Sequence, residues 1–229
     1  MRNTYSLYTL AAKPEFGPML REEIRDVLAA NGGVFTGTAL QGLKKLDSFI
    51  REDMRVNSLG GGRSSSVIQY ATWLHRTAYT DDSTGSFRRE VLKPFTLPSG
   101  QRIPAGAVII VPASGINQDD SVYPNADNFD PLRFYNLRGS GSGVDSATAT
   151  ARNQMVSVNT EHLTFGFGKH ACPGRFFAAN EIKMIMANIL MNYDVGLVGD
   201  ATERYPNLVF ASQHIPDPTK SLRFRRAVA

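Results

Sequence analysis

The sequence predicts a mainly α-helical protein with small β-sheets. Apolar residues recur at three- and four-residue steps in three stretches, 19–30, 46–55 and 176–190, which is the period of an amphipathic helix. In a fourth stretch, 95–111, short apolar runs alternate with Pro- and Gly-containing turns, as in small sheets. The 229 residues are 42% hydrophobic and 20% charged, so the chain can build a packed core.

Two helices are expected in the first quarter of the chain. The first covers about 19–30 and ends at Asn31-Gly32-Gly33, a sequence typical of a C-terminal cap. The second covers 46–55 and contains Glu52 and Arg55, which lie three residues apart and can therefore touch. Taken alone, such a pair is usually a solvated surface pair that contributes little to stability.

The stretch 95–111 predicts a small sheet. Residues 95–97 and 107–111 are apolar runs typical of strands, and 98–100 and 103–106 have turn composition. Further along, residues 139–152 begin with a Gly/Ser repeat, so we expect a mobile surface loop there.

The ten residues from Phe165 to Gly174 hold the only cysteine of the chain, Cys172. A free thiol ionises near pH 8.5, but backbone N–H groups of a Gly-rich turn and the start of the following helix, 176–190, favour its thiolate. Gly168 and Gly174 are expected to supply the turn's unusual dihedral angles. Two other interpretations remain open at this point. A lone cysteine is usually a small buried apolar residue, and a Cys/His nucleophile with His170 is conceivable.

This stretch resembles the haem-ligand loop of the cytochrome P-450 monooxygenases, whose pattern is Phe-x-x-Gly-x-x-x-Cys-x-Gly. The positions are filled by Phe165, Gly168, Cys172 and Gly174, and Ala178 extends the match. The resemblance implies that Cys172 is the axial ligand of a haem b iron. It also implies that His170 contacts a haem propionate and that Phe165 packs near the proximal face. In this class of haem protein, the thiolate is known to donate electron density that favours O–O cleavage.

Two more segments follow the order of that family. Pro131-Leu132-Arg133-Phe134 resembles its Pro-x-Arg-Phe segment, and Glu52 with Arg55 resembles its helical Glu-x-x-Arg pair. The resemblance implies that Glu52, Arg55 and Arg133 form a buried charge triad with a structural role. Buried charges of this kind persist only when they are paired.

The resemblance implies a haem-thiolate monooxygenase that inserts one atom of O2 into an organic substrate and takes electrons from NADPH through a cytochrome reductase. The sequence of residues 206–218 is similar to the corresponding sequence of fungal members that oxidise terpenoids and other secondary metabolites. Lys169 and Arg175 are candidates for docking the reductase. Two alternatives are a haem-thiolate isomerase or dehydratase, and an inactive truncated fragment that binds haem poorly.

The chain is interpreted as one domain, 1–229, equivalent to the C-terminal half of the family's fold. The acid-alcohol pair expected on the long distal helix is not found in the sequence, although 6–15 resembles the exit of that helix. Residues 63–85 interrupt the resemblance and are expected to be an insertion, for instance a retained intron. A spliced transcript that still encodes them would refute that origin.

Composition and charge exclude several classes of protein. The net charge of +4 is mild and no basic run is interleaved with aromatic residues, so nucleic acid is not an expected partner. One cysteine excludes an internal disulfide framework. No apolar run reaches 18 residues, so no membrane-spanning segment is expected here. Full-length relatives are expected to carry an N-terminal anchor in the endoplasmic reticulum membrane and to face the cytosol.

Overall fold

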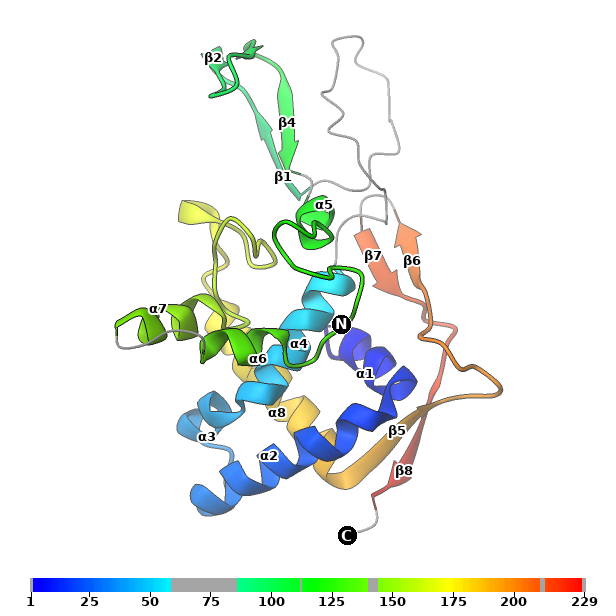
Figure 1. The fold of residues 1–229 in the computed structure, drawn as a ribbon. Helices are drawn as coiled ribbons and strands as arrows, with labels where there is room; N and C mark the ends of the chain where they lie inside the picture. Colours follow the sequence, from blue (N-terminus) through cyan, green and yellow to red (C-terminus); the bar gives the residue numbers. More distant parts are fainter. Residues whose placement is uncertain (1, 59–85, 112, 140–143, 211–212, 228–229) are drawn as a thin grey trace.

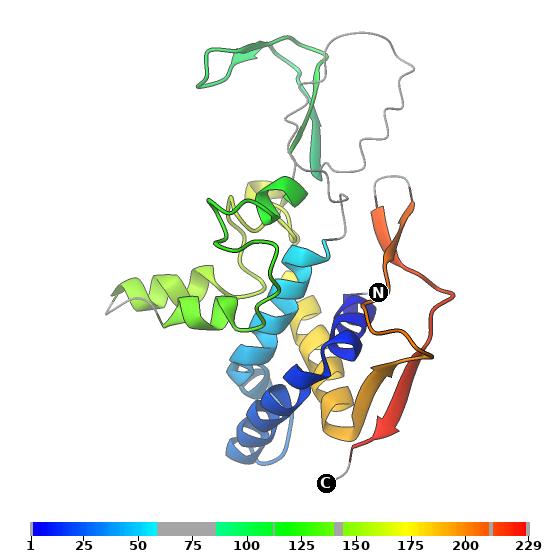
Figure 2. The same cartoon turned by 45° about the vertical axis from the view of Figure 1, so that its right-hand side comes forward.

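The computed structural model describes residues 2–58, 86–111, 113–139, 144–210 and 213–227. The expected insertion at 63–85 lies outside the described residues. Within them, helices dominate and the strands form small two-stranded sheets, so the predicted fold class is confirmed. Figures 1 and 2 show a helical body from which residues 86–111 project.

Four helices form the centre of the body: α1 (Arg2–Ala12), α2 (Gly17–Ala30), α4 (Lys44–Val56) and α8 (Arg175–Asn192). Their inward side chains make one apolar cluster. Its fully buried members include Leu20, Ile24, Phe49, Ile50 and Met186. Removing such side chains from water is the main force that holds the helices together. The helices predicted at 19–30, 46–55 and 176–190 are therefore present, each slightly longer than expected.

Local sequence signals fix the helix ends. A short 3-10 helix, η1 (Pro14–Phe16), separates α1 from α2. Gly32 and Gly33 follow α2 with φ of 66° and 77°, and the Gly33 N–H donates to the Leu28 carbonyl over 2.8 Å. This geometry is a glycine C-cap, as the sequence predicts. Thr36 caps α3 (Gly37–Gly42) by accepting a hydrogen bond from the Ala39 N–H.

The carboxylate of Glu23, on α2, caps the N-terminus of α4. It accepts hydrogen bonds from the backbone N–H groups of Lys45 and Leu46, over 2.6 and 2.9 Å. Burial raises the pKa of Glu23, and the hydrogen bonds from Lys45 and Leu46 oppose that rise. The start of α4 is thus fixed by a neighbouring helix, because its own N-cap residue, Leu43, has no side-chain acceptor.

The described strands pair as four antiparallel two-stranded sheets. The pairs are β1 (Ser86–Glu90) with β4 (Val108–Val111), β2 (Phe95–Thr96) with β3 (Arg102–Ile103), β5 (Tyr193–Leu197) with β8 (Leu222–Arg226), and β6 (Asn207–Phe210) with β7 (Gln213–Pro216). The strands predicted near 95–97 and 107–111 are present. They do not pair with each other: β2 pairs with β3, and β4 pairs with β1. Arg102 and Ile103 form a strand, although Ile103 was expected in a turn.

Three α-helices follow β4 and precede α8 in the described part of the chain. A short helix, α5 (Ala113–Asn117), leads into a polar loop and then into α6 (Arg133–Arg138). The next helix, α7 (Val144–Arg152), corrects the expectation of a mobile loop over 139–152. Alanine at alternate positions favours the helix, and two side chains fasten it. Thr150 Oγ1 donates to the Arg138 carbonyl, and Asn153 Nδ2 donates to the Ala149 carbonyl.

No helix within the part of the chain that the structure describes is long and apolar enough to cross a lipid bilayer.

Candidate functional site

The loop that contains Cys172 closes on itself through its backbone. The Cys172 N–H donates to the Phe165 carbonyl over 2.7 Å, and a single 3-10 turn, η2 (Gly168–His170), lies between them. The Phe165 ring packs against the main apolar cluster, so the loop is fastened to the core at its first residue. Helix α8 begins at Arg175, and the positive end of its dipole is therefore close to Cys172.

Two glycines of this loop have a left-handed backbone. Gly168 has a φ of 58°, so it supplies the unusual dihedral angle that was expected of it. Gly166, which the sequence pattern did not single out, has a φ of 88°, and a Cβ there would lie 2.7 Å from the His170 carbonyl oxygen. Gly166 is therefore the position where only glycine fits. In the sequence, only the position of Gly166 between two aromatic residues in a Gly-rich turn could have indicated this requirement.

Gly174 does not have the role expected of it. Its φ is −82°, which any residue can adopt, so it does not supply an unusual dihedral angle. A Cβ at Gly174 would meet no heavy atom within 4 Å. Within the described residues, neither the backbone nor a neighbouring atom requires glycine at this position.

The thiol is exposed, and three exposed phenylalanines lie within five residues of it in the sequence. Cys172 is solvent-accessible, and Phe167, Phe176 and Phe177 are 47%, 56% and 75% exposed. Apolar rings beside a thiol are unusual on a surface unless a partner or ligand covers them. Among the residues that the structure describes, no three His, Cys, Asp or Glu side chains gather into a metal site. The donor set thus fits a flat apolar group held by one thiolate, as haem is, and not a four-ligand ion site.

The other residues of the pattern lie around this thiol. His170 is exposed at the end of η2, beside exposed Lys169. The Ala178 N–H donates to the Gly174 carbonyl in the first turn of α8. Arg175 Nη1 donates to the Cys172 carbonyl over 3.0 Å, and its guanidinium lies over the Phe176 ring. Arg175 is thus engaged within the loop, whereas Lys169 is available to solvent.

The structure brings Glu52, Arg55 and Arg133 together behind the helices. Arg55 donates two hydrogen bonds to the Glu52 carboxylate, over 2.9 and 2.8 Å, and Arg133 Nε donates a third over 3.2 Å. Glu52 and Arg55 are 0% and 1% exposed. Arg133 also donates to the carbonyls of Pro124, Asn125 and Asn128, so the cluster shapes the loop before α6.

Upstream of the loop, His162 is buried and neutral. Burial lowers its pKa to about 3, and the nearby charge of Arg51 acts in the same direction. Its Nε2 donates to the Met155 carbonyl over 3.2 Å. Asn159 Oδ1 accepts from the N–H groups of Glu161 and His162, so the approach to the loop is itself held by hydrogen bonds.

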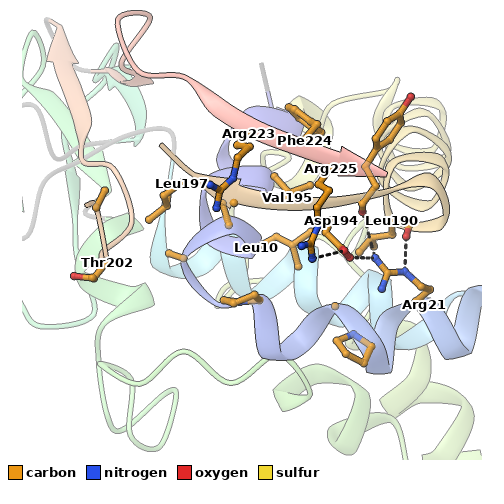
Figure 3. Close-up of a pocket in the computed structure, with 18 of the residues that line it drawn as sticks. Leu10, Arg21, Leu190, Asp194, Val195, Leu197, Thr202, Arg223, Phe224 and Arg225 are labelled. Atoms are coloured by element: carbon orange, nitrogen blue, oxygen red, sulfur yellow. Dashed lines mark hydrogen bonds and ion pairs between the residues drawn. The ribbon is translucent and has the colours of Figure 1, made fainter. Parts of the chain in front are cut away.

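A separate groove of about 990 Å³ lies between the α1–α2 corner and the β5–β8 sheet. Figure 3 shows Asp194 between Arg21 and Arg225. Arg223 also lines the groove. Asp194 pairs with both Arg21 and Arg225, and these pairs lower its pKa. No residue from 165–178 lines the groove, so we do not assign it to the thiol site.

Comparison with known proteins gives the class of this chain. The family model named Cytochrome P450 matches residues 82–217. Cytochrome P450 monooxygenase ATR3 of Stachybotrys chlorohalonatus is 43% identical over 97% of this chain and 42% of its own length. Cytochrome P450 monooxygenase 151 of Postia placenta is 37% identical, over 97% of this chain and 38% of its own length.

A third relative, Cytochrome P450 monooxygenase atmQ of Aspergillus flavus, is 34% identical over 97% of this chain and 36% of its own length. The chain belongs to the cytochrome P450 family. It spans about two fifths of the length of these relatives.

Proposed function

We propose that this chain carries the haem-ligand part of a monooxygenase, with Cys172 as the axial ligand of a haem b iron. The observation that carries the proposal is an exposed thiol on a closed loop just before α8, with three exposed phenylalanines within five residues of it in the sequence. The relatives support it, because they are named cytochrome P450 monooxygenases. When bound, the haem supplies O2 activation and the oxidation itself.

The protein's own groups hold and orient the haem. The Cys172 sulfur would hold the iron as a thiolate, since a coordinated metal deprotonates a thiol. The open space beside Gly174 would leave room for the ring, and the exposed phenylalanines would supply apolar surface that excludes water from it. His170, exposed at the end of η2, is assigned to a haem propionate, with which it can form a hydrogen bond.

The proposed reaction converts an organic C–H substrate, O2, NADPH and a proton into the hydroxylated product, water and NADP⁺. One oxygen atom enters the substrate and the other leaves as water, with two electrons from NADPH passed through a cytochrome reductase. We assign the substrate to the terpenoids and other secondary metabolites. The similarity of residues 206–218 to fungal members that oxidise such compounds supports this assignment. We place the full-length protein on the cytosolic face of the endoplasmic reticulum, as its resemblance to eukaryotic members suggests.

Oxygen labelling tests this function. Cells that express the chain within its full-length gene, together with a reductase, are grown under ¹⁶O2 or ¹⁸O2, and their metabolites are compared by mass spectrometry. The proposal predicts new products that each carry a single ¹⁸O, and no such products from Cys172→Ala. New Cys172-dependent products without the label would identify an isomerase or dehydratase instead.

For the reductase, exposed Lys169 is the residue we assign to docking, because Arg175 is engaged within the loop. Lys169→Glu should slow reduction by the reductase at low salt. Lys93→Glu, at an exposed position in the turn after β1, is the matched control. Equal reduction rates for the two variants would refute this docking site.

A further inference from the structure

A second buried charge cluster lies on α4, and none of the sequence motifs contains it. Its centre is Asp47, which is 4% exposed. The Asp47 carboxylate accepts a short hydrogen bond from Arg138 Nη2 and lies 3.4 Å from Lys183 Nζ. Lys183 and Arg138 are 5% and 8% exposed, so all three charges are buried together.

The partners of Asp47 come from both sides of the Cys172 loop. Upstream, Asp47 Oδ2 accepts a hydrogen bond from the Met155 N–H over 2.9 Å. Downstream, Lys183 belongs to α8, the helix that begins just after the loop, and its Nζ also donates to the Leu40 carbonyl over 2.7 Å. One carboxylate therefore fastens the two flanks of the segment 155–183 to α4.

Neighbouring guanidinium groups reinforce the upstream flank. Arg51 Nη1 donates to the carbonyls of Arg152 and Gln154, over 2.8 and 3.0 Å. Arg138 donates to the carbonyl between them, that of Asn153, over 2.8 and 3.2 Å. Backbone groups of four consecutive residues, 152–155, are thus held by side chains of α4 and α6. Between the end of α7 at Arg152 and the start of η2 at Gly168, the described chain forms no helix or strand. These side-chain hydrogen bonds are therefore what holds the backbone of 152–155 in place.

We propose that Asp47 is a positioning residue for Cys172, because its carboxylate fixes both flanks of the thiol loop against α4. The inference rests on the proposed function, since it matters only if Cys172 binds haem iron. A thiolate ligand must be held to within a fraction of an ångström to bind iron in a productive geometry. The loop has few regular elements of its own, so that precision has to come from its flanks.

The experiment uses hydrogen exchange by mass spectrometry on the whole chain without haem. The variant is Asp47→Asn, which leaves Arg138 and Lys183 buried without their carboxylate. The matched control is Asp53→Asn on the same helix. Asp53 is 0% exposed and binds Arg2, Ser6, Thr9 and Asn57, so its contacts lie with α1 and the end of α4 and not with the loop.

Asp47→Asn should speed amide exchange in peptides covering 153–172 by at least tenfold relative to Asp53→Asn, with the two compared at equal global stability. Lys183→Met, which keeps the aliphatic stem, should speed exchange in the same peptides and serves if Asp47→Asn does not fold. Lys183→Arg should restore slow exchange. Uniform acceleration along the chain, or the same pattern for the Asp47 and Asp53 variants, would overturn the proposal.

Haem binding is then measured separately. If the parent chain forms a thiolate-type haem spectrum, Asp47→Asn should give a smaller share of that spectrum than Asp53→Asn, and equal shares would contradict the proposed role. If the parent chain forms none, the proposed function fails for this chain, and the exchange experiment still decides whether Asp47 fixes the loop.

Discussion

At the scale of single residues, the backbone distinguishes glycines that look equivalent in the sequence. Gly166 combines a left-handed backbone with a close approach to the His170 carbonyl. Gly174 has an ordinary backbone and open space beside it. The first is required by the loop itself, and we assign the second to the group that the loop binds.

Replacing these two glycines by alanine should therefore have opposite signatures. Gly166→Ala should lower the free energy of unfolding by roughly 2–3 kcal/mol, from left-handed strain and the clash. Gly174→Ala should change the stability of the haem-free chain by no more than about 0.5 kcal/mol and should weaken haem binding. Urea unfolding and haem titration measure the two effects. Equal stability losses would show that the distinction is wrong.

His162 is a residue whose burial makes stability depend on pH. Its folded pKa, about 3, is below the ordinary value of 6.5, so the unfolded chain binds more protons between these values. Its contribution is complete above pH 6.5 and is lost as the pH falls, by about 1.4 kcal/mol per pH unit. We expect His162→Phe to flatten the stability profile between pH 6.5 and 5. Parallel profiles for the two proteins would contradict a buried neutral imidazole.

At the scale of secondary-structure elements, α4 organises its neighbours through buried charges. Glu52 and Arg55 hold the loop before α6, Asp47 holds the flanks of the thiol loop, and Asp53 holds α1. Charges buried in this way cost free energy to desolvate, so each must be paired. The helix therefore sets the relative positions of α1, α6 and α8 as well as filling the core.

Removing the carboxylate of the triad tests this view of α4. Glu52→Gln leaves Arg55 buried without a counter-charge and should cost about 3–5 kcal/mol of unfolding free energy. The control is Glu161→Gln, since Glu161 pairs with Arg152 at the surface, with side chains 39% and 54% exposed. An exposed pair contributes at most about 1 kcal/mol. Similar losses in urea unfolding for both variants would contradict the assignment.

At the scale of the whole molecule, the sequence predicts the helical class, three of the central helices and the residues of the thiol loop. The helices can be identified because apolar periodicity and glycine caps are local signals in the sequence. It misses the helix over 144–152, because a Gly/Ser-rich stretch precedes an alanine-rich helix that the side chains of Thr150 and Asn153 fasten. It also misses Asp47, because the partners of a buried charge are known only after the chain has folded.

The central claim is that Cys172 is the haem ligand, and one spectrum tests it directly. The purified chain is loaded with haem, reduced, and exposed to carbon monoxide beside Cys172→Ala and Gly174→Ala. We predict a long-wavelength Soret band from the parent chain, a weaker one from Gly174→Ala and none from Cys172→Ala. A long-wavelength band that persists in Cys172→Ala would contradict the claim, because the thiolate of Cys172 could not then be its source.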